Sequence, residues 1–162
     1  FRESLDLDST SPKNFGRAGD FFRFMENLGE AERCYARGFR LDRTNANLAK
    51  ELAGIYRRTE RERDALAVLD MALREGSDDP DLAWSAALAA HRLDQHQATL
   101  TYLDEYEQHV PDQPWVNYYR ASALLSLDRP AEALVATELE ATNNPECPFA
   151  AAAFRALPSP KR

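Results

Sequence analysis

The chain has 162 residues, of which 44% are hydrophobic and 29% charged, so it is long enough to bury one sizeable core. Its formal net charge of −7 argues against a general nucleic-acid binder, because contact with phosphates requires a dominant basic face. No apolar run approaches the roughly 18 residues of a membrane span, and no signal peptide is visible.

The predicted elements are helices that recur in pairs with a period of 34 residues. Four full units follow one another without insertion or deletion, at 12–45, 46–79, 80–113 and 114–147. Small residues occupy the two positions where paired helices would cross, since small side chains let two backbones approach. These positions hold Gly19, Ala53, Ala87 and Ala121 in the first helices, and Ala31, Ala65, Thr99 and Ala133 in the second helices. A fixed period with small residues in phase predicts a helical repeat array.

The two ends of the chain are predicted to be partial units. Residues 1–11 align with the end of a unit, so we expect the remnant of a preceding second helix and a fragment of a longer array. Proline, which is tolerated in a first helical turn, recurs at the unit starts Pro12, Pro80 and Pro114 and again at Pro148. Residues 148–162 should form a terminal helix and a tail. That helix is either partly buried or a contact face for a partner or a second copy.

With this 34-residue period and these small residues at the helix crossings, the chain resembles the tetratricopeptide repeat (TPR) family, whose unit is a 34-residue helix–turn–helix. The family's motifs appear as Leu52-Ala53 with Tyr56, as Ala31 with Tyr35, and as the terminal prolines Pro111 and Pro145. Tyr106 and Glu140 depart from the pattern, because they replace a small residue late in the second helix. The resemblance implies an all-α fold, a right-handed superhelical α-solenoid of antiparallel helix hairpins.

The resemblance also implies where a partner binds, because the first helices of such an array line its concave groove. The predicted groove residues are Lys13, Arg23, Lys50, Arg57, Arg58, Trp84, His91, Arg92, Trp115 and Tyr118. The first half of this set is basic and the second half is aromatic. Arginine binds carboxylates through paired hydrogen bonds, and Trp and Tyr are common binding anchors. The set therefore suits a peptide or loop that is acidic at one end and has apolar anchors at the other.

Two alternatives remain open for these residues. Arg57 and Arg58 could be the solvated end of a helix, and Trp84 and Trp115 could belong to the core between repeats. One partner class of the TPR family is excluded, because this sequence lacks the residues that bind it. Some TPR proteins clamp the terminal carboxylates of heat-shock chaperones with Lys, Asn and Arg. Those positions here hold Gly16, Asp20, Gly54, Trp84 and Leu88.

Catalytic chemistry finds little support in the sequence, which contains no nucleophile elbow, phosphate-binding loop or dinucleotide fingerprint. Glu105 and His109 lie four apart and could touch a metal, but no further ligands converge by spacing. Cys34 and Cys147 lack metal-ligand spacing and are expected to be unpaired, which favours a reducing compartment such as the cytoplasm. We expect no enzyme activity and no cofactor.

The predicted function is a non-enzymatic protein–protein interaction scaffold, without nucleic-acid binding or membrane insertion. The alternatives are a structural repeat segment of a larger enzyme or of a secretion or assembly component, and a module that self-associates through its terminal helices.

Overall fold

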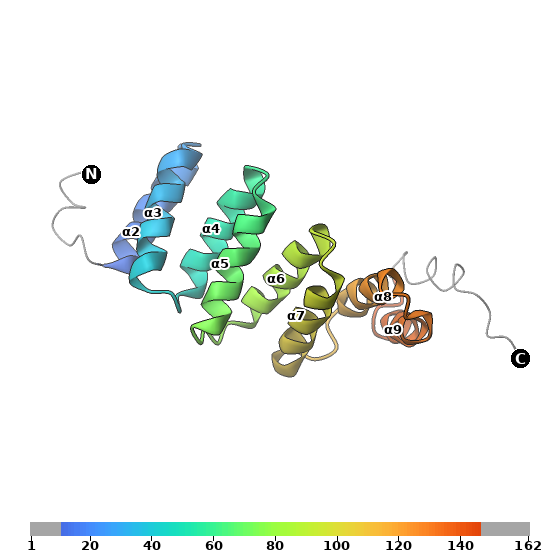
Figure 1. The fold of residues 1–162 in the computed structure, drawn as a ribbon. Coiled ribbons are helices and arrows are strands. Elements are labelled where there is room, and N and C mark those ends of the chain that lie inside the picture. The colour runs from blue at the N-terminus through green and yellow to red at the C-terminus, as the bar shows by residue number, and fades with distance from the viewer. Residues whose placement is uncertain (1–10, 147–162) are drawn as a thin grey trace, which may run out of the picture. The chain divides into compact units, whose positions relative to one another are not determined.

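The computed structural model describes residues 11–146, which form helices joined by short turns, with no strand among them (Figure 1). In chain order the helices are α2 (Pro12–Phe24), α3 (Leu28–Leu41), α4 (Ala46–Arg58), α5 (Glu62–Arg74), α6 (Pro80–Arg92), α7 (His96–His109), α8 (Val116–Ser126) and α9 (Pro130–Asn143). The chain divides into two compact units between Ala89 and Ala90, within α6. The predicted second-helix remnant and terminal helix lie outside the described residues, except for Ser11, the N-cap residue of α2.

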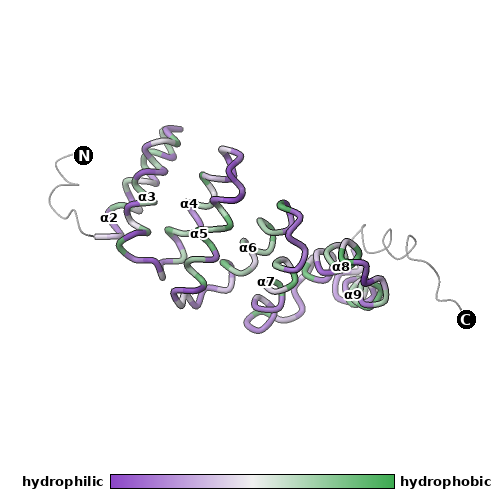
Figure 2. Tube along the Cα trace, in the orientation of Figure 1, coloured by the Kyte–Doolittle hydropathy of each residue, from purple (hydrophilic) through white to green (hydrophobic). Residues whose placement is uncertain are grey.

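The helices pack in pairs. In the first unit α2 packs on α3 and α4 on α5, and the pairs are joined through α3 and α4. In the second unit α8 packs on α9 and contacts α7. Figure 2 shows hydrophobic and hydrophilic residues alternating along the helices, as expected when one face of each helix is buried. All eight small residues predicted at the helix crossings are buried, as such a position requires.

The turn inside each pair has the same backbone conformation. An acidic residue with positive φ recurs every 34 residues, at Glu26 (57°), Glu60 (60°), Asp94 (55°) and Asp128 (57°). A single left-handed residue ends a helix and reverses the chain within a few residues. Side chains also cap the N-termini of α3 and α4. Asn27 accepts a hydrogen bond from the backbone N–H of Glu30, and Asn45 accepts one from Leu48.

The first pair is fitted around one large side chain, that of Tyr35. This residue is 1% exposed, and it fills the place that Leu69 and Leu103 take 34 and 68 residues later. A Cβ atom on Gly19 would lie 2.4 Å from Cε1 of the Tyr35 ring. Only glycine therefore fits opposite Tyr35, whereas alanine occupies the corresponding place in the other three units.

The start of α8 differs from the prediction. Helices α2 and α6 begin at a proline, but α8 begins at Val116, two residues after Pro114. Between them Trp115 has a φ of 74°, and its backbone N–H donates to Oε1 of Glu140 at 2.8 Å. The Glu140 side chain is 1% exposed and also accepts from Nδ2 of Asn144 at 3.1 Å. The glutamate that breaks the repeat pattern thus anchors the residue before α8 to α9.

Candidate functional site

Two of the predicted groove cations are held by the chain's own side chains. Nε of Arg23 donates to the hydroxyl oxygen of Tyr35 at 3.2 Å and lies 3.4 Å from a carboxylate oxygen of Glu51. The hydrogen bond with Tyr35 and the charge of Glu51 raise the pKa of Arg23. The Tyr35 hydroxyl in turn donates to Asp20 at 2.8 Å. Arg23 therefore links α2 to α3 and to α4.

Lys50 is similarly engaged. Its Nζ donates to Oδ2 of Asp79 at 2.7 Å and lies 3.5 Å from Oδ2 of Asp81, at the start of α6. Desolvation lowers the pKa of Lys50, but the hydrogen bond and the two carboxylate charges more than offset this, so its pKa is raised. A carboxylate from a partner would have to compete with both aspartates for this ammonium group.

The other three predicted groove cations of the first unit are exposed to solvent. Arg57 and Arg58 occupy the last turn of α4 and are exposed, as is Lys13 in the first turn of α2. The structure records no hydrogen bond or ion pair of these three side chains with the rest of 11–146. Of the predicted basic residues in this unit, these are the ones free to meet an anionic partner.

The second unit brings four rings together, which we call the aromatic ladder: Trp115, Tyr118, Tyr119 and His91. The Trp115 and Tyr118 centroids lie 6.1 Å apart, those of Tyr118 and Tyr119 5.2 Å, and those of Tyr119 and His91 5.1 Å. Each pair meets edge to face, an arrangement that aromatic rings favour. Trp115 is 38% exposed at one end of the ladder.

The surroundings of His91 favour its neutral form and lower its pKa. Its ring is partly buried, and desolvation followed by the positive charge of His96 lowers its pKa. A neutral imidazole extends the uncharged surface of the neighbouring Tyr119 ring, whereas a protonated one would place a positive charge there. The ladder therefore offers mostly uncharged surface at neutral pH.

The two other predicted groove residues lie on α6. Trp84 is half-buried in the first unit, and Arg92 is exposed in the last turn of the helix, within the second unit. Tyr119 joins the ladder but was not predicted. It directly follows Tyr118 on α8, but the repeat register pointed to Tyr118 alone.

Metal-binding groups are not assembled in the part of the chain that is described. No set of three or more His, Cys, Asp and Glu side chains between residues 11 and 146 is placed to hold an ion. His109 contacts Glu105, the other residue considered as a metal ligand, through the main chain: its Nδ1 lies 3.1 Å from the backbone oxygen of Glu105. Over the same residues, no helix has the length and apolar character needed to cross a membrane.

No protein-family model matches the chain, and no match was found among curated proteins. Solved structures do match it. YrrB, described as a TPR protein with an unusual peptide-binding site, is 17% identical and superposes with a TM-score of 0.82 over 97% of this chain and 81% of its own. A crystal structure of MamA is 17% identical, with a TM-score of 0.80 over 90% of this chain and 80% of its own. A second MamA structure is 18% identical, with a TM-score of 0.76 over 86% and 81%. At this level of identity the likeness concerns the fold, and the chain has the all-helical repeat fold of TPR proteins, as its sequence predicts.

Proposed function

We propose that the chain is a protein-interaction scaffold and that a peptide or loop of a partner lies along the first helices of its repeats. The observation that carries this proposal is the aromatic ladder, which joins Trp115 and two tyrosines of α8 to His91 of α6. Large rigid rings with a partly exposed tryptophan at one end form the kind of surface on which binding energy concentrates. The peptide-binding site ascribed to YrrB is consistent with such a role for this fold.

The charge of the partner is proposed from the first unit. Arg57 and Arg58 lie side by side in sequence, are exposed, and have no recorded ion pair among the described residues. Two such guanidinium groups favour an acidic segment, mainly by increasing its association rate and selecting against basic competitors. Lys13, Trp84 and Arg92 are flanking contacts in this proposal. Arg23 and Lys50 have a lesser role, because intramolecular carboxylates already hold them.

The proposal is tested by selecting ligands from a displayed library of random peptides on the full chain. We expect the selected peptides to share acidic residues and at least one apolar or aromatic anchor. Their affinities would then be measured for Arg57→Glu/Arg58→Glu and for Trp115→Ala. Each variant should bind about ten-fold more weakly, equivalent to the loss of one good contact.

The matched control is Arg40→Glu/Arg63→Glu, which changes net charge equally at exposed positions on second helices α3 and α5. It should bind like the wild type at physiological salt. Selection of peptides without acidic residues, or equal losses in the control and in Arg57→Glu/Arg58→Glu, would show that the first-helix cations do not recognise the partner.

A further inference from the structure

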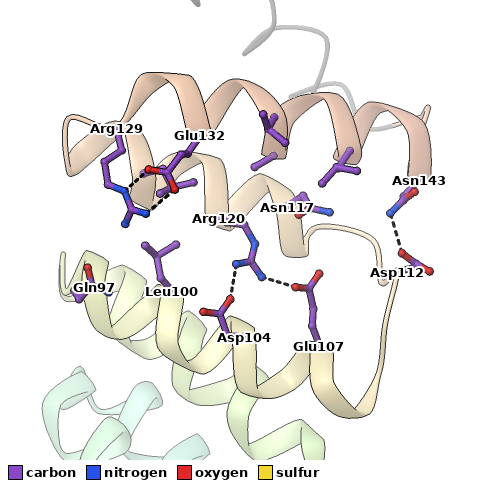
Figure 3. A pocket seen from close by; sticks show the side chains of 14 residues that line it. Gln97, Leu100, Asp104, Glu107, Asp112, Asn117, Arg120, Arg129, Glu132 and Asn143 are labelled. Atoms are coloured by element: carbon purple, nitrogen blue, oxygen red, sulfur yellow. Dashed lines mark hydrogen bonds and ion pairs between the residues drawn. The ribbon is translucent and has the colours of Figure 1, made fainter.

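A groove of about 620 Å³ lies in the second unit between α7 and α9, with α8 behind it (Figure 3). On α7 its lining runs from Gln97 to Glu107, and on α9 from Glu132 to Asn143. On α7 the lining residues are spaced by three or four, and on α9 the same spacing holds except for the adjacent Val135 and Ala136, so each helix contributes one continuous stripe. At 1.5 Å per residue the stripes are roughly 15 Å long, or about three helical turns.

The middle of the groove is apolar. Leu100 and Leu124 are 6% and 4% exposed and form its buried part. Val135 and Leu139, one turn apart on α9, are 56% and 48% exposed although both line the groove. Two neighbouring large aliphatic side chains that remain in water beside a concave apolar surface are typical of an interaction site.

The polar lining is predominantly acidic. Four carboxylates, those of Asp104, Glu107, Asp112 and Glu132, line the groove with two guanidinium groups, those of Arg120 and Arg129. Arg120 is shared between Asp104 and Glu107, which leaves one negative charge uncompensated there. Within residues 11–146 the one donor recorded for Asp112 is a neutral amide, Nδ2 of Asn143 at 3.5 Å. The C-terminal end of α7 adds the partial negative charge of its helix dipole to this end of the groove.

The basic groups of the groove are already bound. Both terminal nitrogens of Arg120 are engaged by carboxylates, and Arg129 donates to both oxygens of Glu132 at 2.7 and 2.6 Å. The positive charges of both arginines are thus paired within the groove, and an anionic ligand would be repelled by the surplus of carboxylates. A cationic ligand gains from the same surplus.

We propose that this groove binds an amphipathic helix of a partner that carries lysine or arginine along one edge. Apolar residues spaced by three and four would pack against Val135 and Leu139, and the basic edge would face Asp104, Glu107 and Asp112. A helix of about three turns matches the length of the stripes. None of the aromatic ladder lines this groove, so the inference is independent of the proposed function and concerns a partner of opposite charge.

The test uses a synthetic helix-forming peptide of about 14 residues, with leucines spaced by three and four and lysines on the remaining face. A second peptide replaces every lysine with glutamate. Binding to the full chain would be followed by fluorescence anisotropy. We expect the lysine peptide to bind at least about ten-fold more tightly than the glutamate peptide.

Leu139→Lys should weaken the lysine peptide about ten-fold, because it removes an apolar contact and adds a like charge. Leu125→Lys is the matched control, since Leu125 is 45% exposed on α8 outside the groove. Asp104→Asn/Glu107→Gln should also weaken binding and reduce its salt dependence. Glu105→Gln/Glu138→Gln changes the charge of the same unit outside the groove, on α7 and α9, and should have no effect. Circular dichroism would confirm that all four variants fold.

Several results would overturn the proposal. They are equal binding of the two peptides, equal losses in a groove variant and its control, and no binding of the lysine peptide up to about 1 mM. A wild-type dimer in sedimentation equilibrium that only Leu139→Lys dissociates would also overturn it, because a second copy of the chain would then cover the groove.

Discussion

The pairing of Gly19 with Tyr35 allows a quantitative prediction for the variant Gly19→Ala. Alanine normally stabilises the interior of a helix by roughly 0.5–1 kcal/mol relative to glycine. Here the added methyl group would lie 2.4, 2.6 and 2.8 Å from three ring atoms of Tyr35. The ring cannot rotate away freely, because the residue is 1% exposed and its hydroxyl is bonded to Asp20 and Arg23.

The overlap should therefore outweigh the gain in helix propensity. Inserting a methyl group into a packed site costs about 1–3 kcal/mol, and displacing the ring also weakens two hydrogen bonds worth about 1 kcal/mol each. We expect Gly19→Ala to lower the free energy of unfolding by about 2 kcal/mol. The assay is urea denaturation followed by circular dichroism, with unchanged steepness of the transition as evidence that the variant unfolds in the same way.

Gly54 provides the matched control in the next repeat. It lies inside α4, and a Cβ atom added there would meet nothing within 4 Å. Gly54→Ala should therefore stabilise the protein by roughly 0.5–1 kcal/mol. The variant Gly19→Ala/Tyr35→Leu, which copies the alanine and leucine of the second repeat, should be less destabilised than the two single changes predict by addition. A neutral or stabilising Gly19→Ala, or strict additivity with Tyr35→Leu, would show that the glycine is not required by the ring.

Three further predictions concern stability. Ala65→Leu should overpack the crossing of α4 and α5, where Ala65 is 0% exposed, and cost about 1–3 kcal/mol. An unchanged melting temperature would mean that the helices cross elsewhere. Glu140→Ala should cost about 2–3 kcal/mol, because it removes the buried acceptor of the Trp115 N–H. Glu140→Gln keeps a carbonyl oxygen there and should cost less, so equal unfolding midpoints for the two variants would contradict the anchoring role. Burial lowers the pKa of His91, so the unfolded chain takes up its proton first as the pH falls. Stability should therefore be fully present above about pH 6.5 and decrease below it, and His91→Asn should show a smaller decrease in denaturant midpoints measured between about pH 5 and 8.

The repeat architecture was predictable from the sequence, because the positions where helices cross tolerate only small side chains. Gly19 and Ala53 are such positions in first helices, Ala31 and Ala65 in second helices, and the members of each pair lie one period apart. The start of α8 was not predictable in the same way. It depends on a hydrogen bond between Trp115 and Glu140, which are 25 residues apart, and nothing in the repeat pattern pairs these two residues.

The candidate site was predicted less completely than the fold. Position on a helix indicated which cations face outward, but not which of them the chain neutralises itself. Lys50 bonds to Asp79, 29 residues away, so its partner is fixed by how consecutive repeats pack. The groove between α7 and α9 combines residues from three helices in the same way. Its carboxylates come from α7, from the loop after it and from α9, so the pattern along any one helix did not reveal the full set.

The proposed function requires that a partner segment bind along the first helices. The most direct measurement is nuclear magnetic resonance of the ¹⁵N-labelled chain during titration with a peptide obtained from the library selection. We predict the largest shift changes at the Trp115 indole N–H, at the amides of α8 around Tyr118, and at Arg57 and Arg58 of α4. Changes confined to the second helices α3, α5, α7 and α9, with an unaltered Trp115 signal, would contradict this function.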